Sequence, residues 1–485
     1  MTAFGFRSVA FATASCLAAC GCASSSGPSP FTPYPGPTRP ALPAAVAPSP
    51  VIPVRYQEAP QPVALPSPLP EDRLLLTAED VVRAVLERNP TLDRMRAAAE
   101  AAAARYPQVT SLDDPMLALS TAPGSAWSPN VDYAARVELS QKLLSPGKRG
   151  LKGSAARAEA AAAVADIDDA RLQLVEAAVS ALADYYLAER ATEVARENAR
   201  ILTELRQTAE AEVRAGRGLQ QNINQAEVEL ARQEERLVAL RRARQVAVAR
   251  LNTLMHLPPD RPLPPPAELK SAAPLPDPVQ LRTAAVSARP DVRAAADRLA
   301  AEEAALGLAL KEYNPDVDVM AAYDGFWQGQ NGRPLQWQVG ARVNLPVRFA
   351  RRDAAVAEAR AKVAQRRAEL ARLTDRVGFE VQEAFEQLRE SEEVVRLYES
   401  KVLPAADANV REAQAAYTNN RVPFLTLVEA QRGRVALRDR YYEAVAETAR
   451  RRAALERAAG GQEAGFTTET QRTPSRHKTE RNQKN

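Results

Sequence analysis

The chain has 485 residues, enough for two or three ordinary domains or for one large repetitive domain. Its hydrophobic fraction is 46% but aromatic residues make up only 5%, so much of the apolar content is alanine, which favours closely packed helices over a thick core. Lys plus Arg (64) nearly balances Asp plus Glu (60), and a net charge of +4 argues against nucleic acid as the main partner, because duplex binders concentrate a basic excess on one face.

The first 19 residues have the pattern of a secretory signal peptide, with an apolar run over residues 8–19. Residues 17–20, Leu-Ala-Ala-Cys, resemble the bacterial lipobox, in which the cysteine becomes the acylated first residue of the mature protein. The alternative is an ordinary signal peptide with a chance cysteine. Gly21 follows Cys20 where a lipoprotein retained in the inner membrane commonly carries Asp, so the resemblance implies the outer membrane.

Residue types that carry chemistry are scarce in the rest of the chain. All three cysteines lie within the first 22 residues, which leaves no disulfide, thiolate metal site or cysteine nucleophile further on. The only histidines are His256 and His477, and the sequence holds no HExxH motif, phosphate loop or nucleophile elbow. We therefore expect no cofactor and no bound metal, and predict that the chain is not an enzyme.

A proline-dense segment, residues 20–73, has little charge and no helical period, which predicts an extended tether or simple disorder. A start that resembles a capping box at residues 77–80 then opens a helix. Asn89-Pro90 breaks that helix, and a second helix continues through Ala104.

The hydrophobic period then changes from helical to alternating. Residues 114–122 and 132–142 alternate apolar and polar side chains, and the connection between them has a loop composition. This pattern predicts a β-hairpin, which Ser145-Pro146-Gly147-Lys148 closes.

About a hundred residues of strong helix formers follow, residues 149–256, with no proline and one glycine-bearing turn at residues 215–219. They predict a long helical hairpin whose first arm, about 62 residues at about 1.5 Å each, is roughly 90 Å long. From Leu230 onward, apolar residues fall near a three-four spacing, which predicts packing against other long helices.

The same plan then starts again after a proline-rich connector, residues 257–278. Arg289-Pro290 stands where Asn89-Pro90 stood, and strand-like alternation returns at residues 316–327 and 335–347.

A second long helical stretch, residues 351–459, is interrupted at Pro404 and turns at residues 419–423, about 204 residues after the first turn. Residues 74–256 and 279–459 are therefore two copies of one plan, followed by a polar tail, residues 460–485, that we expect to be disordered.

Two β-hairpins give four strands with two exposed edges. A bilayer does not tolerate such edges, because every backbone donor and acceptor must be paired internally. A closed barrel with a usable lumen needs more strands than one chain offers. If these strands are inserted in a membrane, several chains must build the barrel.

The lipobox, the doubled plan and the segment Leu-Asn-Thr-Leu-Met-His-Leu-Pro-Pro at residues 251–259 together resemble the TolC family of outer membrane efflux factors. The resemblance implies a mainly α fold with a small β part. In that family three protomers build a 12-stranded β-barrel continuous with a 12-helix periplasmic tunnel (α-barrel). It also implies a lipid-anchored protein in the outer membrane of a Gram-negative bacterium, with a long periplasmic domain.

The resemblance further implies the exit duct of a tripartite efflux pump, which passively conducts substrates to the exterior. In the family, the helical hairpin tips meet a periplasmic adaptor, which links the duct indirectly to an RND-type transporter of the inner membrane. The corresponding residues here are Gly216, Arg217, Gly218, Leu219, Asn420, Arg421, Val422 and Pro423. The alternative is that they only make good turns, although Leu219 and Val422 at an exposed end favour contact.

In the family, acidic residues just after the second tip narrow the tunnel mouth and form its closed gate. Glu429 aligns with one acidic position, Thr426 occupies the other, and Gln225 stands at the level of Glu429 in the first repeat. A three-fold axis would make Glu429 a ring of three carboxylates, which favours cations. The alternative is one solvated charge among many.

The segment from Gln141 to Arg149 resembles the strand-to-helix passage of the cation-efflux (heavy-metal) branch, although a turn with interfacial Lys and Arg describes it as well. Trp127, Trp327 and Trp337 fall in or beside the predicted strands, consistent with an aromatic belt at the membrane interface.

Three other functions remain open at this stage. A type I secretion duct for polypeptides uses the same fold. A periplasmic adaptor also has a helical hairpin, but two helix-strand repeats argue against it. A purely structural coiled-coil lipoprotein leaves the four alternating segments unexplained. The substrate, whether metal ions, drugs or polypeptide, is also open.

Overall fold

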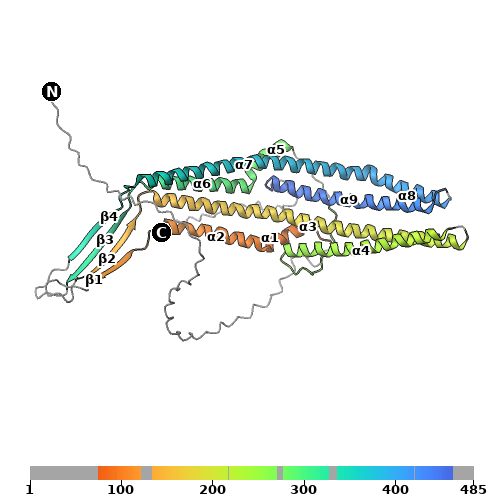
Figure 1. Ribbon diagram of the computed structural model, residues 1–485, viewed down its shortest axis with the longest axis horizontal. Coiled ribbons are helices and arrows are strands. Elements are labelled where there is room, and N and C mark those ends of the chain that lie inside the picture. Colours follow the sequence, from red (N-terminus) through yellow and green to blue (C-terminus); the bar gives the residue numbers. More distant parts are fainter. Residues whose placement is uncertain are drawn as a thin grey trace, which may run out of the picture. The chain divides into compact units, whose positions relative to one another are not determined.

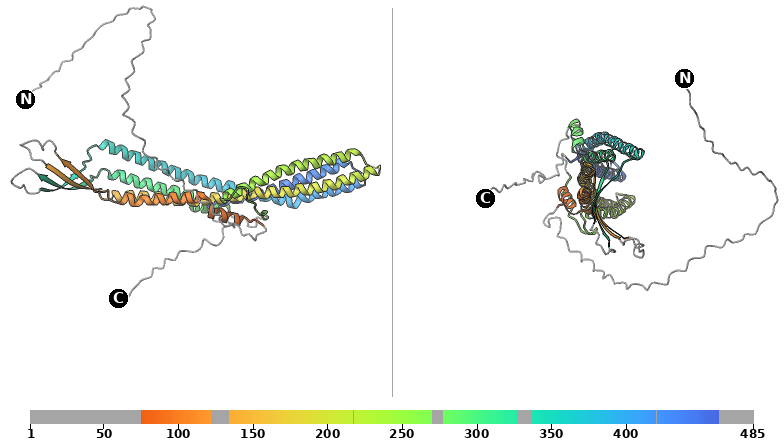
Figure 2. Two further views of the ribbon diagram at one scale, coloured as in Figure 1. Left: turned by 90° about the horizontal axis from the view of Figure 1, so that it is seen from below. Right: turned by 90° about the vertical axis from the view of Figure 1, so that its left-hand side faces the viewer.

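The structure is a computed structural model that describes residues 75–121, 134–216, 218–269, 277–326, 336–419 and 421–461. These residues belong to one compact unit, Pro66–Asn485. The strands lie at one end of this unit and the turns of the two long helical hairpins lie at the other (Figures 1 and 2).

The first repeat follows the predicted order of helices, strands and long hairpin. Its elements are α1 (Ala78–Arg88), α2 (Pro90–Thr110), β1 (Met116–Thr121), β2 (Ala134–Leu143), α3 (Lys148–Arg214) and α4 (Gln220–Leu254). Thr77 caps α1 by accepting the N–H of Asp80 at 3.3 Å, and Asn89 caps α2 by accepting the N–H of Thr91 at 2.9 Å. Local capping chemistry therefore fixes where these two helices begin.

The second repeat has the same order. Its elements are α5 (Pro278–Ala288), α6 (Pro290–Lys311), β3 (Val317–Phe326), β4 (Gln336–Val343), α7 (Phe349–Leu397), η2 (Tyr398–Val402), α8 (Leu403–Thr418) and α9 (Phe424–Ala458). The predicted interruption at Pro404 is a single π-helical turn, η2, that joins α7 to α8 without a break in the rod. Proline has no N–H and crowds the preceding turn, and the wider turn accommodates it.

The long helix α3 is the centre of the bundle, in contact with α1, α2, α4, α6 and α9. Eleven of its 22 buried residues are alanine. Small side chains let helix axes approach closely, so several helices share one thin core. The main core cluster includes Leu182 and Tyr185 of α3, Val85 of α1 and Leu251 of α4.

The four strands form one antiparallel sheet in the order β1-β2-β3-β4. Strands β2 and β3 pair over ten residues, so the sheet joins the two repeats. The predicted four strands and two long helical hairpins are thus confirmed. Among the described helices, none is both long enough and apolar enough to cross a membrane.

A buried ion pair lies where the strands meet the long helices. Lys148, the first residue of α3, is only 2% exposed, and its Nζ lies 2.9 Å from Oδ1 of Asp316 and 3.1 Å from the carbonyl oxygen of Asn314. Burial alone would raise the pKa of Asp316, but the N–H of Ser145 and the ammonium of Lys148 outweigh it and hold this pKa below its ordinary value. The pair ties the start of α3 to the start of β3.

We predict that Lys148→Ala lowers the free energy of unfolding by about 3 kcal/mol, because it leaves the Asp316 carboxylate buried without its partner. Urea unfolding in detergent measures this, with Arg149→Ala as the control, since Arg149 is the exposed neighbour. Because the pKa of Asp316 is depressed, the contribution is fully present above its ordinary pKa of 3.8 and is lost as the pH falls through the lower folded-state value. Equal unfolding curves for the two variants would contradict the assignment.

Candidate functional site

The first tip is the turn between α3 and α4. Gly216 has φ 71°, a left-handed conformation that glycine adopts without strain. The N–H of Gly218 donates to the carbonyl oxygen of Glu212 at 3.0 Å, and a Cβ at Gly218 would lie 2.9 Å from the Cβ of Glu212. The turn therefore needs glycine at both positions. Arg217 lies outside the described residues.

The second tip joins α8 to α9. The N–H of Arg421 donates to the carbonyl oxygen of Ala416 at 2.8 Å, and Pro423 stands at the start of α9. Asn420 lies outside the described residues, whereas Arg421 and Pro423 are exposed. Both turns are thus closed by backbone hydrogen bonds that leave their outer side chains available to a partner.

The two apolar tip residues differ in exposure. Leu219 is 66% exposed, as expected for a contact residue at an open end. Val422 is only half-exposed, because it packs against the cluster formed by Tyr417, Phe424 and Leu427. Val422 therefore supports the tip from within, which differs from the expectation that both side chains stand free.

The two hairpins pack against each other directly behind the tips. Ala226 of α4 belongs to the same apolar cluster as Tyr417 and Phe424, whose rings meet edge to face at 5.6 Å. The hydroxyl of Tyr417 donates to Oε2 of Glu212 at 2.6 Å. Burial and this hydrogen bond raise the pKa of Tyr417, so the hydroxyl stays protonated and acts as a donor.

Two ion pairs continue this connection away from the tips. Glu229 of α4, with a side chain only 5% exposed, accepts hydrogen bonds from Arg432 of α9 and from Arg232 at 2.8 Å. The hydrogen bond from Arg432 lowers the pKa of Glu229 below its ordinary value despite burial. Further along, Arg236 of α4 pairs with Asp439 of α9.

The candidate gate residues lie close to these contacts. Thr426 and Glu429 are exposed in the first two turns of α9, directly after the second tip, and Gln225 is half-buried on α4. Glu429 is near enough to Arg432 to raise the pKa of that guanidinium, together with Glu229. The gate position is therefore next to the Glu229–Arg432 ion pair between the hairpins.

The sheet at the opposite end has one apolar and one polar face. The register places the apolar residues of all four strands side by side on one face: Leu117, Leu119, Val137, Leu139, Val319, Ala321, Tyr323, Trp337 and Val339. Leu119 is 72% and Val339 83% exposed, so this face has no cover within the described chain. Trp337 packs edge to face on Tyr323, while Trp127 and Trp327 lie outside the described residues.

The other face carries the charges. Arg136 lies 3.4 Å from Glu138 and 3.9 Å from Asp324, and Arg342 lies 3.8 Å from Glu138. Gln338 donates to Asp324 at 2.8 Å. Charged groups are stable in contact with water, whereas their transfer into lipid costs free energy. The polar face therefore suits contact with water and the apolar face suits contact with lipid.

The contacts that tie the tips together were not among the features predicted from the sequence. Tyr417 and Glu212 are 205 residues apart, and Arg432 and Glu229 are 203 apart. These separations match the offset of about 204 between the repeats, since equivalent positions lie at the same level. A search for oppositely charged residues about 204 positions apart would therefore have found the Glu229–Arg432 pair. Lys148, noted within the basic strand-to-helix passage, has a structural partner in Asp316.

Comparison with known proteins agrees with this geometry. Residues 81–255 match the family model described as outer membrane efflux protein. No curated protein matches the chain. Similar solved structures are the outer-membrane channel OprN (23% identity, TM-score 0.68, covering 79% of this chain and 90% of that one) and the outer membrane protein VceC from Vibrio cholerae (19%, 0.69, 79% and 96%).

The open state of the MtrE outer membrane channel of Neisseria gonorrhoeae is similar too (21% identity, TM-score 0.68, 81% and 91% coverage). OprN and MtrE are outer membrane channels, and this chain shares their fold. The match to the family model is thus confined to the first repeat, and the likeness of the solved structures extends over both repeats as a shared fold.

Proposed function

We propose that three copies of this chain form the outer membrane exit duct of a tripartite efflux pump. One observation carries the proposal: the chain holds an amphipathic four-stranded sheet at one end and two tied hairpin tips at the other (Figure 1). A duct that spans two compartments needs both ends on one rigid body. The helix α3 alone, 67 residues at about 1.5 Å each, is about 100 Å long.

The sheet supports a barrel shared between copies. Strands β1 and β4 are the edges of the described sheet, and backbone groups at an edge need partners in a bilayer. Three copies of four strands close a 12-stranded barrel. The apolar face then meets lipid, and Arg136, Glu138 and Asp324 on the polar face line the lumen.

The tips support docking to a periplasmic adaptor. Gly216, Gly218, Leu219, Arg421 and Pro423 lie at the end of the rods farthest from the sheet, and Leu219 presents an apolar side chain to solvent. The adaptor connects the duct to an inner-membrane transporter of the RND type. In this proposal that transporter sets which substrate passes.

The gate forms where the tips converge on the three-fold axis. Glu429 contributes one carboxylate per copy. Thr426 and Gln225 lie at a similar height along the helical bundle. The Tyr417–Glu212 hydrogen bond and the Glu229–Arg432 ion pair hold the two hairpins together and so favour the closed duct. A partner that separates the hairpins must break these contacts, which links docking at the tips to opening.

The N-terminus supplies the anchor in this proposal. Cys20 lies outside the described residues. Acylation of its α-amino and thiol groups would tie the proline-dense segment 20–73 to the outer membrane. Two or more acyl chains give stable attachment, because each buried methylene adds about 0.8 kcal/mol.

The gate assignment predicts that Glu429→Ala raises the single-channel conductance of the closed duct in planar lipid bilayers roughly two-fold, because a ring of carboxylates no longer narrows the mouth. Cation preference should fall in the same recordings. Glu227→Ala removes an exposed carboxylate of α4 near the same level and serves as the control. Identical traces for the two variants would remove Glu429 from the gate.

The tip assignment predicts that Gly216→Val prevents assembly with the adaptor while leaving insertion into the outer membrane intact. A β-branched residue at φ 71° is strained, so the turn must distort. Co-purification of the adaptor after cross-linking measures assembly. Gly433→Val is the matched control, because Gly433 lies in α9 with open space around it. Unchanged co-purification of Gly216→Val would reduce this tip to a simple turn.

The anchor assignment predicts that Cys20→Ser abolishes labelling of the protein by radioactive palmitate. Cys22→Ser should be labelled like the unaltered chain, since only the residue after Leu-Ala-Ala is the expected acceptor. Persistent labelling of Cys20→Ser would show that the lipobox is misassigned.

A further inference from the structure

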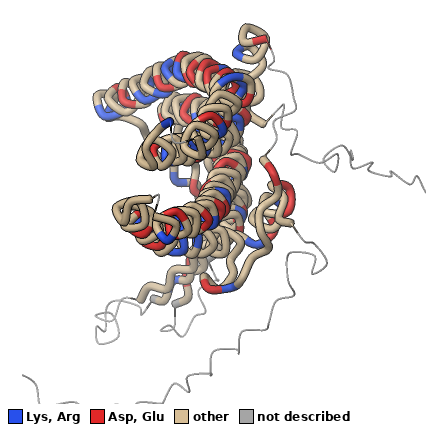
Figure 3. Tube along the Cα trace, turned by 90° about the vertical axis from the view of Figure 1, so that its right-hand side faces the viewer, with Lys and Arg blue, Asp and Glu red and all other residues tan. Residues whose placement is uncertain are grey.

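Two arginines without a partner lie in the passage that leads from β4 into α7, residues 344–352, where the sheet joins the long helices (Figure 1). Arg348 and Arg351 are exposed, and within the described part of the chain neither has an ion pair or a side-chain hydrogen bond. Along the long helices, by contrast, charges of both signs are interspersed (Figure 3). Arginines there such as Arg289 and Arg450 each pair with two carboxylates. The guanidinium groups of the passage are therefore available to a partner from outside the chain.

Exposed apolar side chains surround these two arginines. Leu345 and Val347 precede Arg348 and are 69% and 72% exposed, and Phe349, which is 58% exposed, follows it. The ring of Phe349 stacks on that of Tyr313, with 6.4 Å between the centroids, so its position is fixed. Apolar side chains interleaved with unpaired cations are typical of a surface at the border of a membrane, where long basic side chains reach from the apolar layer to water.

The apolar side chains of the passage continue the apolar face of the sheet. The N–H of Asn344 donates to the carbonyl oxygen of Asp316 at 3.1 Å, which extends the β3–β4 ladder by one pair beyond Val343. Because side chains alternate along a strand, Leu345 lies on the same face as Val343 and Trp337.

The length of this apolar stripe places the border of the lipid close to Leu345. From Trp337 to Leu345 the chain runs about 26 Å, which is about 20 Å across a membrane when the strand is tilted by about 40°. The apolar band of an outer membrane barrel is about 25 Å tall. Arg348 and Arg351, which follow Leu345, therefore reach the level of the lipid headgroups.

The equivalent passage of the first repeat, between β2 and α3, lies at the same height. Asp316 accepts the N–H of Asn344 through its backbone carbonyl, and its carboxylate binds Lys148. The next residue, Arg149, is exposed and has no ion pair among the described residues. Both passages thus bring free positive charge to one level.

The carboxylates near this level have partners of their own. Glu312 lies 3.6 Å from the buried Lys148, and Asp353 accepts a hydrogen bond from the hydroxyl of Tyr313. Neither of them pairs with an arginine of the passage.

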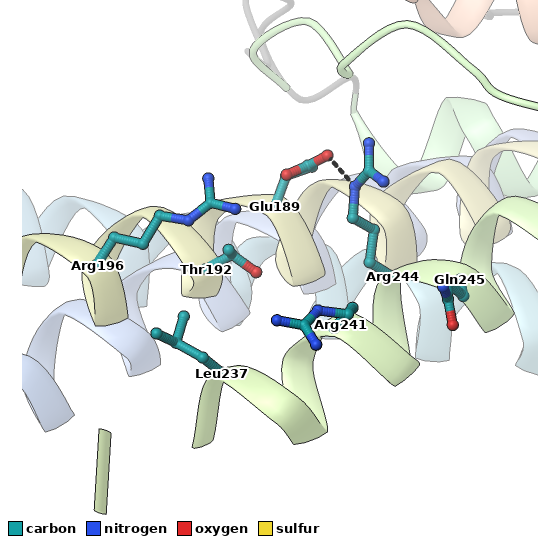
Figure 4. A pocket seen from close by; sticks show the side chains of 7 residues that line it. All are labelled: Glu189, Thr192, Arg196, Leu237, Arg241, Arg244 and Gln245. Carbon is teal, nitrogen blue, oxygen red and sulfur yellow. Dashed lines mark hydrogen bonds and ion pairs between the residues drawn. The ribbon is translucent and has the colours of Figure 1, made fainter. Parts of the chain in front are cut away.

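Unpaired arginines also occur in a pocket between α3 and α4, but their surroundings differ. This pocket has a volume of about 570 Å³ and is lined by Arg196 and Arg241, together with Arg244, which pairs with Glu189 (Figure 4). Leu237 is the only apolar residue of its lining. The combination of free cations with a broad apolar surface therefore distinguishes the passage from the pocket.

We propose that the passage 344–352 binds an anionic phospholipid of the periplasmic leaflet, with Arg348 and Arg351 on its phosphate. The inference rests on the proposed function, which places the apolar face of the sheet in lipid. Guanidinium groups bind phosphate through paired N–H donors and are weakly hydrated, which suits the border of a membrane. Leu345, Val347 and Phe349 then lie against the first methylenes of the acyl chains.

The test is lipid retention by the full-length protein, measured by native mass spectrometry after incubation with equal amounts of phosphatidylglycerol, which is anionic, and phosphatidylcholine, which is zwitterionic. The unaltered protein should retain mainly phosphatidylglycerol. Arg348→Gln/Arg351→Gln should lower the ratio of bound phosphatidylglycerol to phosphatidylcholine roughly 25-fold, because each basic side chain at a membrane surface contributes about five-fold. Arg348→Lys/Arg351→Lys should keep most of the preference, since the charge remains. An unchanged ratio in the glutamine variant would overturn the proposal.

The matched control is Arg372→Gln/Arg396→Gln. Both are exposed arginines of α7 without an ion pair in the described structure, and they lie about 30 and 70 Å further along the rod than Arg351. This variant loses the same charge from the same helix, and its lipid ratio should equal that of the unaltered protein. An equal loss of preference in both variants would assign the effect to overall charge and overturn the site.

A second measurement reports the apolar contact and leaves both arginines in place. In vesicles of brominated phosphatidylglycerol, the fluorescence that Phe349→Trp adds to the unaltered protein should be quenched more strongly by bromine near the glycerol end of the chains than by bromine near the methyl end. The reason is that the passage lies at the border of the apolar layer. Absence of quenching by either lipid would show that the next copy or another protein covers the passage, which would overturn the proposal.

The remaining outcomes separate this inference from the proposed function. An unaltered protein that stays monomeric and does not insert into vesicles would overturn the duct itself. A trimer that inserts but retains the two lipids equally would overturn only the lipid site. Displacement of the bound phosphatidylglycerol by inorganic phosphate would assign the arginines to a free anion instead.

Discussion

Close approach of α3 to five other helices is the constraint on which the rest of the structure depends. Alanines such as Ala178, Ala181 and Ala195 are fully buried along it, and larger side chains there would push the neighbouring axes apart. Because both repeats pack on this one rod, their hairpins reach the same level at the tips, and their strands meet in one sheet. The ion pairs between α4 and α9 can form only because corresponding residues of the two hairpins lie at the same height along the bundle.

Features that depend on neighbours in sequence could be predicted from the sequence alone. Thr77 caps α1 through an atom three residues away, and the alternation of Arg136, Val137 and Glu138 assigns each side chain to a face because strand periodicity is two. The candidate tips Gly216 and Pro423 also follow from local turn chemistry. Local sequence patterns therefore predicted most helices and strands, as well as the sheet and the hairpin tips.

Features that depend on distant partners could not be predicted in this way. Nothing near Glu229 in sequence indicates Arg432, and Val422 looked exposed because the cluster beneath it is assembled from α4, α8 and α9. Similarly, a net charge of +4 conceals a basic stretch in α4, residues 232–250, and an acidic stretch in α7, residues 380–397, since composition averages over surfaces that the fold separates. Local charge density, rather than the total, is what a partner meets.

The single π turn before Pro404 has a mechanical consequence. At this turn the N–H of Leu403 bonds to the carbonyl of Tyr398, five residues back, so the rod is wider and less regular here than in the α-helices on either side. The 16 residues of α8 beyond it form an arm of about 24 Å. A bend of about 10° at the π turn would carry Thr418 roughly 4 Å sideways, so a small angular change far from the mouth becomes a displacement the size of a hydrated ion's radius.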